Sequence, residues 1–162
     1  MTGMGNPGGW SLGQQDTVVA ALDRAVAAHP DRVLLDFGGE LHTYAQVDRR
    51  STRLAHAFAA LGVQAGQTVV TMLDNNVDAV LCWFAINKLC AVSVPINTAL
   101  KGEFLRHQIA DAGAGLVICE ASYVDRIAAV SDGIPEVRQV LHRGTAVGPN
   151  CGDLPLAPLD DH

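Results

Sequence analysis

Short apolar runs alternate with helix-like segments along the middle of this chain, and the alternation restricts the folds that it can adopt. The segments between the runs carry apolar residues three or four positions apart, at 77–89, 102–112 and 122–130. The runs themselves show little of the polar alternation of a half-exposed strand and lie at 69–73, 91–96, 116–119 and 137–141. Buried strands separated by helices predict a mostly parallel sheet with helices on both faces. Since such crossovers are right-handed, we expect part of a doubly wound α/β fold.

A helix and a hairpin are expected ahead of the sheet. Residues 16–28 repeat apolar side chains every fourth position, which favours a helix. The apolar run 33–37 is followed by the pair Gly38-Gly39 and by a second short run, 41–44. Because paired glycines readily adopt the positive φ angles of a tight turn, this pattern predicts an antiparallel hairpin.

Residue types at the expected helix ends support two further helices. Thr43 and Gln46 have the spacing of a capping box, in which each side chain accepts from a free backbone N–H of the first turn. Gly62 stands where a helix that begins there would end in a left-handed residue. Asn75 or Asn76 is expected to cap the next helix. These signals place helix boundaries on both sides of the first sheet strand.

The two ends of the chain differ from the middle in composition. Residues 1–15 are rich in Gly, Asn and Gln, and we expect a flexible arm there. Residues 144–162 hold many Gly and Pro residues and are expected to form a loop or linker that is cut short. The folded unit is therefore predicted to span 16–143.

Composition excludes several classes of function. Hydrophobic residues make up 49% of the chain and charged residues 17%, yet no apolar stretch reaches the ~20 residues of a membrane span. The net charge of −6 has the wrong sign for a nucleic-acid-binding protein. The four cysteines form no C-x-x-C pair, and Cys82, Cys90 and Cys119 lie in apolar runs. We therefore expect buried free thiols, which are typical of a cytoplasmic protein.

No group of residues has the spacing of a known catalytic motif. The sequence holds no nucleophile elbow, no P-loop and no H-E-x-x-H pair, and none of its six histidines has a partner at a recognisable spacing. We assign no catalytic residue, no cofactor-binding residue and no metal ligand. Asn97 and Thr98 follow a strand end, where ligands collect in open α/β sheets, so they are the candidates for substrate binding. The alternative is a turn in which Asn97 caps backbone groups.

Several blocks of this sequence resemble, in the same order, motifs of the adenylate-forming enzymes. Residues 43–55 read TYAQVDRRSTRLA and are similar to TYxELxxxxNRLA, and residues 61–69 are similar to LGVxxGDxV. Residues 88–97 resemble KxGAVxVPLN, and residues 100–114 resemble the helix end ELxxxLxDSGA. Asp74 and Cys90 replace a usual proline and a usual glycine. The resemblance extends over about 16–140 and is greatest to the acyl-CoA ligases, particularly those for fatty acids or carnitine.

The resemblance implies the N-terminal segment of an ATP-dependent acyl-CoA ligase. In that family a carboxylate attacks ATP to give an acyl-adenylate and pyrophosphate, and CoA then displaces AMP. ATP, Mg²⁺ and CoA are thus the cofactors implied for the full-length family, with a carboxylic acid, in this branch a fatty acid, as substrate. The family's phosphate loop, its acidic residues and its catalytic lysine have no counterparts in this sequence. We therefore expect the chain alone to bind no cofactor and to be inactive.

Two alternatives remain open at this point. The chain could be a non-catalytic interaction module that pairs through its sheet edge with a separately encoded ligase remainder or with a paralogous ligase. A homo-oligomer of this chain also stays open. It could also be a small Rossmann-type nucleotide-binding domain, because Gly3, Gly5 and Gly8 spell G-x-G-x-x-G, although no strand precedes them. In the ligase interpretation the high apolar content predicts an exposed apolar face where a missing C-terminal portion would pack.

Overall fold

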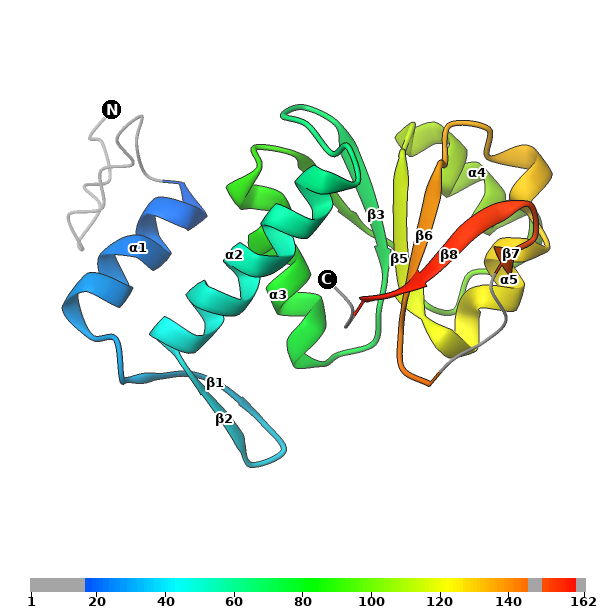
Figure 1. The fold of residues 1–162 in the computed structure, drawn as a ribbon. Helices are drawn as coiled ribbons and strands as arrows, with labels where there is room; N and C mark the ends of the chain where they lie inside the picture. Colours follow the sequence, from blue (N-terminus) through cyan, green and yellow to red (C-terminus); the bar gives the residue numbers. More distant parts are fainter. Residues whose placement is uncertain (1–16, 146–149, 160–162) are drawn as a thin grey trace, which may run out of the picture.

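A six-stranded sheet lies at the centre of the computed structural model, which describes residues 17–145 and 150–159 (Figure 1). The helices are α1 (Val18–Ala28), α2 (Tyr44–Ala60), α3 (Val77–Lys88), α4 (Gly102–Ala112) and α5 (Val124–Ala128). The strands are β1 (Val33–Phe37), β2 (Glu40–Thr43), β3 (Thr68–Met72), β4 (Val92–Pro95), β5 (Leu116–Glu120), β6 (Gln139–Arg143), β7 (Asn150–Cys151) and β8 (Leu154–Pro158). Short 3-10 turns at Ala121–Tyr123 and Ser131–Gly133 flank α5.

The strand order of the large sheet is β4-β3-β5-β6-β8-β7. Strands β4, β3, β5, β6 and β8 run parallel to their neighbours, and the two-residue β7 pairs antiparallel with β8. The chain begins the sheet at β3, adds β4 on one side, and then crosses β3 to add β5 and β6 on the other side. The predicted doubly wound, mostly parallel arrangement is thereby confirmed.

Helices cover the two faces of the sheet unequally. Helices α1, α2 and α3 lie on one face and α4 and α5 on the other (Figure 1). Alternate residues of each central strand point to opposite faces, so Leu116 and Ile118 join the first core while Val117 and Cys119 join the second. Both faces of β5 are therefore buried, as its unbroken apolar run predicts.

The local signals for the hairpin and the helix ends are confirmed. Gly38 and Gly39 have φ angles of 63° and 92° in the turn between β1 and β2. Thr43 and Gln46 form the predicted capping box of α2. Of the two candidate caps for α3, Asn76 is the one that accepts from a first-turn N–H, that of Ala79.

The C-terminal part differs from the prediction. Residues 144–162 were expected to be a loop or linker, but β8 lies within them and pairs in parallel with β6. The high Gly and Pro content misled the prediction because proline is tolerated in a strand near the sheet edge wherever its missing N–H is not needed. The predicted arm at 1–15, with its glycine motif, lies outside the described residues. The domain limits 16–143 stay a prediction. Among the described residues, no helix is long and apolar enough to cross a membrane.

Candidate functional site

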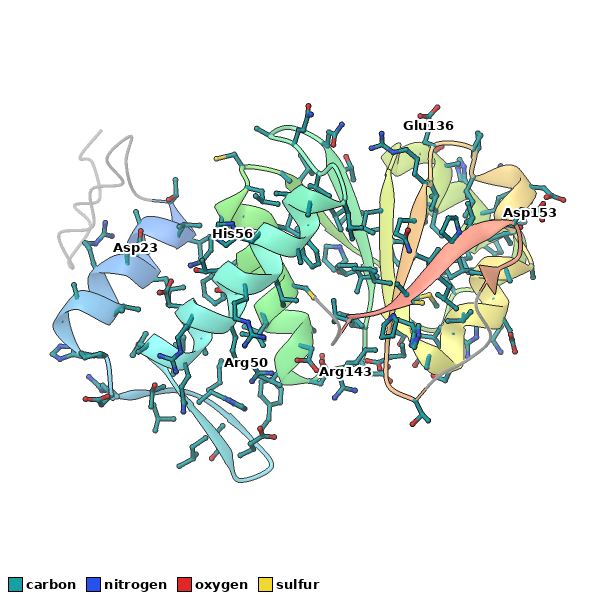
Figure 2. All side chains as sticks on the ribbon, in the orientation of Figure 1. Asp23, Arg50, His56, Glu136, Arg143 and Asp153 are labelled. Carbon is teal, nitrogen blue, oxygen red and sulfur yellow. The ribbon has the colours of Figure 1, made fainter. Side chains whose placement is uncertain are left out.

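The carboxyl ends of the parallel strands form the edge where a site is expected. In an open α/β sheet, ligands bind beyond these ends at the point where the strand order reverses. Here the chain adds β4 on one side of β3 and then β5 on the other side, so that point lies between β3 and β5. Figure 2 shows Arg50 and Arg143 at this end of the molecule and Glu136 at the opposite end.

Glu120 lies at the carboxyl end of β5, beside β3. It ends β5 and is only 7% exposed, yet its carboxylate has several donors. Oε1 accepts from the Asp74 N–H at 3.1 Å and from Asn76 Nδ2 at 2.8 Å, and Oε2 lies 3.3 Å from Arg143 Nη1. Because Asn76 also caps α3, one carboxylate joins β5, β6 and the start of α3. The switch point is thus bridged by the protein's own groups.

Asp78, in the first turn of α3, holds two arginines. Its Oδ2 accepts from Arg143 Nε at 2.6 Å and its Oδ1 from Arg50 Nη2 at 3.2 Å. The hydrogen bond to Asp78 is the largest cause of the raised pKa of Arg143. A carboxylate at this position also interacts favourably with the positive end of the helix dipole. Both guanidinium groups remain partly exposed, so this cluster presents positive charge to solvent beside the sheet edge.

Arg50 extends this cluster to the hairpin. Its Nη1 lies 3.4 Å from Nδ1 of His42, a residue that is 6% exposed on β2. On the other side of the ring, His42 Nε2 lies 3.4 Å from Glu40 Oε1. A chain of polar contacts through His42, Arg50 and Asp78 therefore connects the β1–β2 hairpin to the carboxyl edge of the sheet.

A second group of contacts surrounds one of the two sequence candidates. The Tyr123 hydroxyl donates to Asp74 Oδ1 at 2.7 Å, and this bond is the main cause of the raised pKa of Tyr123. Arg126 stacks over the Tyr123 ring at 4.5 Å and donates from Nη1 to the Thr98 carbonyl at 2.7 Å. Thr98 is thus connected to the edge cluster, by which we mean Arg50, Asp78, Glu120 and Arg143. The connection runs through Arg126, Tyr123 and Asp74. Asn97 Oδ1 instead accepts from the Ala99 N–H at 2.8 Å, which is the turn role weighed as its alternative.

A hollow of about 400 Å³ opens beside this edge, at β3 and β4. Its base is formed by strand residues and its wall by the exposed side of α3. The residues that line it are Thr71, Leu73, Asp74, Asn75, Ala79, Val80, Trp83, Ser93, Pro95 and Ile96. Neither Asn97 nor Thr98 lines it, although Ile96, the residue before them, does, and their role in substrate binding stays a prediction.

A second hollow of about 330 Å³ lies at the opposite, amino end of the strands. Gly66, Gly113 and Gly115 line it together with Glu136 and Arg138. The Arg138 guanidinium lies across Gly115, where a Cβ would come within 2.8 Å of Nη2. Parallel sheets place their sites at the other end, so this hollow is not the site that topology favours.

The thiols are less uniform than predicted. Cys82, Cys119 and Cys151 are buried, whereas Cys90 is exposed and adopts a left-handed φ of 54° just after α3. The prediction that Cys90 is buried was wrong because the residue lies in the turn between α3 and β4. Burial is the main cause that raises the pKa of Cys119 to about 12 and that of Cys151 to about 11. Within the described ranges, no group of His, Cys, Asp or Glu side chains is arranged to hold a metal ion.

The sequence interpretation missed the residues that organise this edge: Asp78, Glu120 and Arg143. An acidic residue directly after a buried strand was the available signal for Glu120. No local pattern links Asp78 to Arg143, because the two are 65 positions apart and meet only through the sheet.

Comparison with known proteins places this fold among enzymes. Residues 22–151 match the family model described as AMP-binding enzyme. A medium/long-chain-fatty-acid–CoA/3-oxocholest-4-en-26-oate–CoA ligase of Mycobacterium tuberculosis is 33% identical over 119 residues, which are 74% of this chain and 22% of that protein. The phosphinothricin tripeptide synthetase PhsC of Streptomyces viridochromogenes is 33% identical over 112 residues, 69% of this chain and 10% of that protein.

The fold is also found in a solved ligase. The anthranilate CoA ligase AuaEII, solved with anthranoyl-AMP, superposes with a TM-score of 0.82 at 22% identity. The superposition covers 88% of this chain and 27% of that protein. At this identity the likeness concerns the fold. The chain thus spans between a tenth and just over a quarter of the length of these proteins.

Proposed function

Because the chain belongs to the AMP-binding enzyme family, we propose that it forms the N-terminal part of an ATP-dependent acid–CoA ligase. The observation that carries this proposal is the family match over 22–151, which includes every strand of the parallel sheet up to β6 and the whole carboxyl-edge cluster. The ligase would join a carboxylic acid to CoA through an acyl-adenylate. The anthranoyl-AMP bound to the solved ligase supports that intermediate.

A fatty acid is the substrate class that we favour. The M. tuberculosis relative is named for medium- and long-chain fatty acids and covers more of this chain than the peptide synthetase does. A thiol-rich interior also suits a reducing cytoplasm, which is where we place the protein.

The two carboxylates at the carboxyl edge, Asp78 and Glu120, do not fit a site for Mg²⁺. Mg²⁺ requires free oxygen ligands, but both oxygens of Asp78 and of Glu120 already accept from protein donors. We therefore propose that ATP, Mg²⁺ and CoA are held by other parts of the ligase. In this segment Glu120 and Asp78 act as positioning groups that fix the carboxyl edge of the sheet.

Pyrophosphate release tests the proposal. The purified chain is incubated with ATP, Mg²⁺, CoA and a series of fatty acids, and we expect no turnover above a heat-treated control. The chain joined covalently to the remaining part of an AMP-binding ligase should give turnover that depends on the fatty acid. Appreciable turnover by the chain alone would show that the proposed division of labour is wrong.

A second candidate function is an interaction module that complements a separately encoded ligase remainder. The exposed side of Trp83, 41% accessible beside the hollow at β4, is the observation that favours it. Large exposed aromatic residues beside an apolar hollow are typical of protein interfaces. Rescue of turnover by mixing the two polypeptides, without covalent linkage, would support this candidate.

A further inference from the structure

The hollow at the amino ends of the strands lies where three neighbouring strands begin. The turns that lead into β3, β5 and β6 line it, and its volume is about 330 Å³. Apart from its glycines, the lining residues are Gln67, Thr68, Pro135, Glu136 and Arg138. Sites for small molecules have volumes of roughly 300–1,000 Å³, so this hollow suits a ligand at the small end of that range.

Arg138 is held against the main chain and not by a carboxylate. Its N–H donates to the Gly115 carbonyl at 2.9 Å. Its guanidinium lies across Gly115, where a Cβ would come within 2.8 Å of Nη2, 3.4 Å of Nε and 3.5 Å of Cζ. A residue without a side chain is therefore needed for this close approach. Among residues 17–145 and 150–159, no carboxylate lies within 4.0 Å of the guanidinium, so its donors are open to a ligand.

Glu136 supplies the opposite charge. It is exposed and lines the same hollow, at the end of the molecule opposite Arg50 and Arg143 (Figure 2). No cationic group of the described residues lies within 4.0 Å of its carboxylate either. Within the described part of the chain, the lining of the hollow holds no charged residue besides Glu136 and Arg138. The hollow thus presents one anionic and one cationic group that do not pair with each other.

Two neutral side chains add hydrogen-bonding groups to the lining. Gln67 Oε1 accepts from the Gln64 N–H at 3.0 Å, which leaves the amide Nε2 as a donor. The Thr68 hydroxyl can both donate and accept. With the guanidinium of Arg138, the lining therefore offers several donors to a carboxylate and one carboxylate, that of Glu136, to an ammonium group.

We propose that this hollow is a binding site for a small amino acid in its zwitterionic form. Arg138 binds the ligand's carboxylate, to which its planar guanidinium can donate two parallel hydrogen bonds. Glu136 binds the ligand's ammonium group. A simple anion would be repelled by Glu136 and a simple cation by Arg138, so a ligand that carries both charges is the better match. The inference does not depend on the proposed function, because the hollow lies at the opposite end of the strands from the carboxyl edge.

The experiment follows the Arg138 side chain directly. The chain is labelled with ¹⁵N-arginine, and the Nε–H signal that is missing from the spectrum of Arg138→Gln is assigned to Arg138. Glycine is the probe, and acetate and methylammonium, each of which carries one of its two charges, are the comparisons. At constant ionic strength and mildly acidic pH, we expect a saturable shift of the Arg138 signal with glycine. The affinity for glycine should be about fivefold higher than for either comparison.

Variants locate the contact. Glu136→Gln removes the charge that binds the ammonium group and should lower the affinity for glycine to that for acetate. Glu103→Gln is its matched control, because Glu103 is exposed at the other end of α4 from the hollow. Arg49→Gln, a change of an exposed arginine on α2, is the control for loss of a positive charge. Both controls should leave the affinity unchanged, and circular dichroism melts establish that each variant is folded.

Four results would overturn the inference. They are an Arg138 signal that does not move at the highest glycine concentration, an unchanged affinity of the Glu136→Gln variant, and an equal loss of affinity in a control variant. The fourth is acetate that binds as tightly as glycine, which would indicate a site for anions alone.

Discussion

Replacing Glu120 with alanine removes the carboxylate that joins β5, β6 and the start of α3. The change leaves the Asp74 N–H and Asn76 Nδ2 without their acceptor, and each lost hydrogen bond costs about 1 kcal/mol. Arg143 also loses one carboxylate, but its side chain is 35% exposed, so solvent reduces that part to about 0.5 kcal/mol. We expect the free energy of unfolding to fall by about 2–3 kcal/mol.

Urea unfolding at pH 7, followed by far-ultraviolet circular dichroism, measures this loss. Glu120→Gln keeps an oxygen for the neutral donors and removes the charge, so it should lose less than half as much as Glu120→Ala. Glu103→Ala is the control, because its ion pair with Arg106 lies at the surface and should leave the midpoint nearly unchanged. If Glu120→Ala unfolds at the same urea concentration as Glu103→Ala, the edge cluster does not stabilise the fold and the reasoning is refuted.

Three further predictions concern a cap, a turn and the thiols. Thr43→Ala removes the capping box of α2 and should cost about 1 kcal/mol in urea unfolding, whereas Thr43→Ser should cost much less. Gly113→Ala should cost about 1 kcal/mol although its Cβ would meet no atom within 4 Å, because φ is 58° there; an unchanged midpoint would contradict this backbone argument. Cys90 should react with a thiol reagent in the folded protein, and Cys119 and Cys151 only on unfolding. Burial raises the pKa of these two thiols above the 9.0 of a free thiol. The contribution of their protonated form to the free energy of unfolding should therefore be complete below pH 9 and lost as pH rises toward 11–12.

The fold was largely predictable because its signals are local. The capping box at Thr43 and Gln46 involves residues three positions apart, and the glycine pair at 38–39 specifies its own turn. The apolar run of β5 predicts burial on both faces without reference to any partner strand. The prediction failed at β8, since a strand that contains two prolines becomes a strand only because β6 lies beside it.

The candidate site was much less predictable. Strand ends pointed to Asn97 and Thr98, but the direction of a side chain after a strand depends on the turn that the chain makes there. The Asn97 side chain accepts from the Ala99 N–H, two positions away. The Thr98 carbonyl instead accepts from Arg126 of α5, 28 positions away. No spacing in the sequence encodes such a distance.

The sequence by itself determined the class of fold, the helix ends and the family, because hydrophobic periodicity, capping and short motifs act over a few residues. Only the tertiary structure decided that Glu120, Asp78 and Arg143 share one edge and that a hollow opens beside Trp83 at β4. The order of strands in a sheet sets which distant residues become neighbours, and that order results from the packing of whole helices on its two faces.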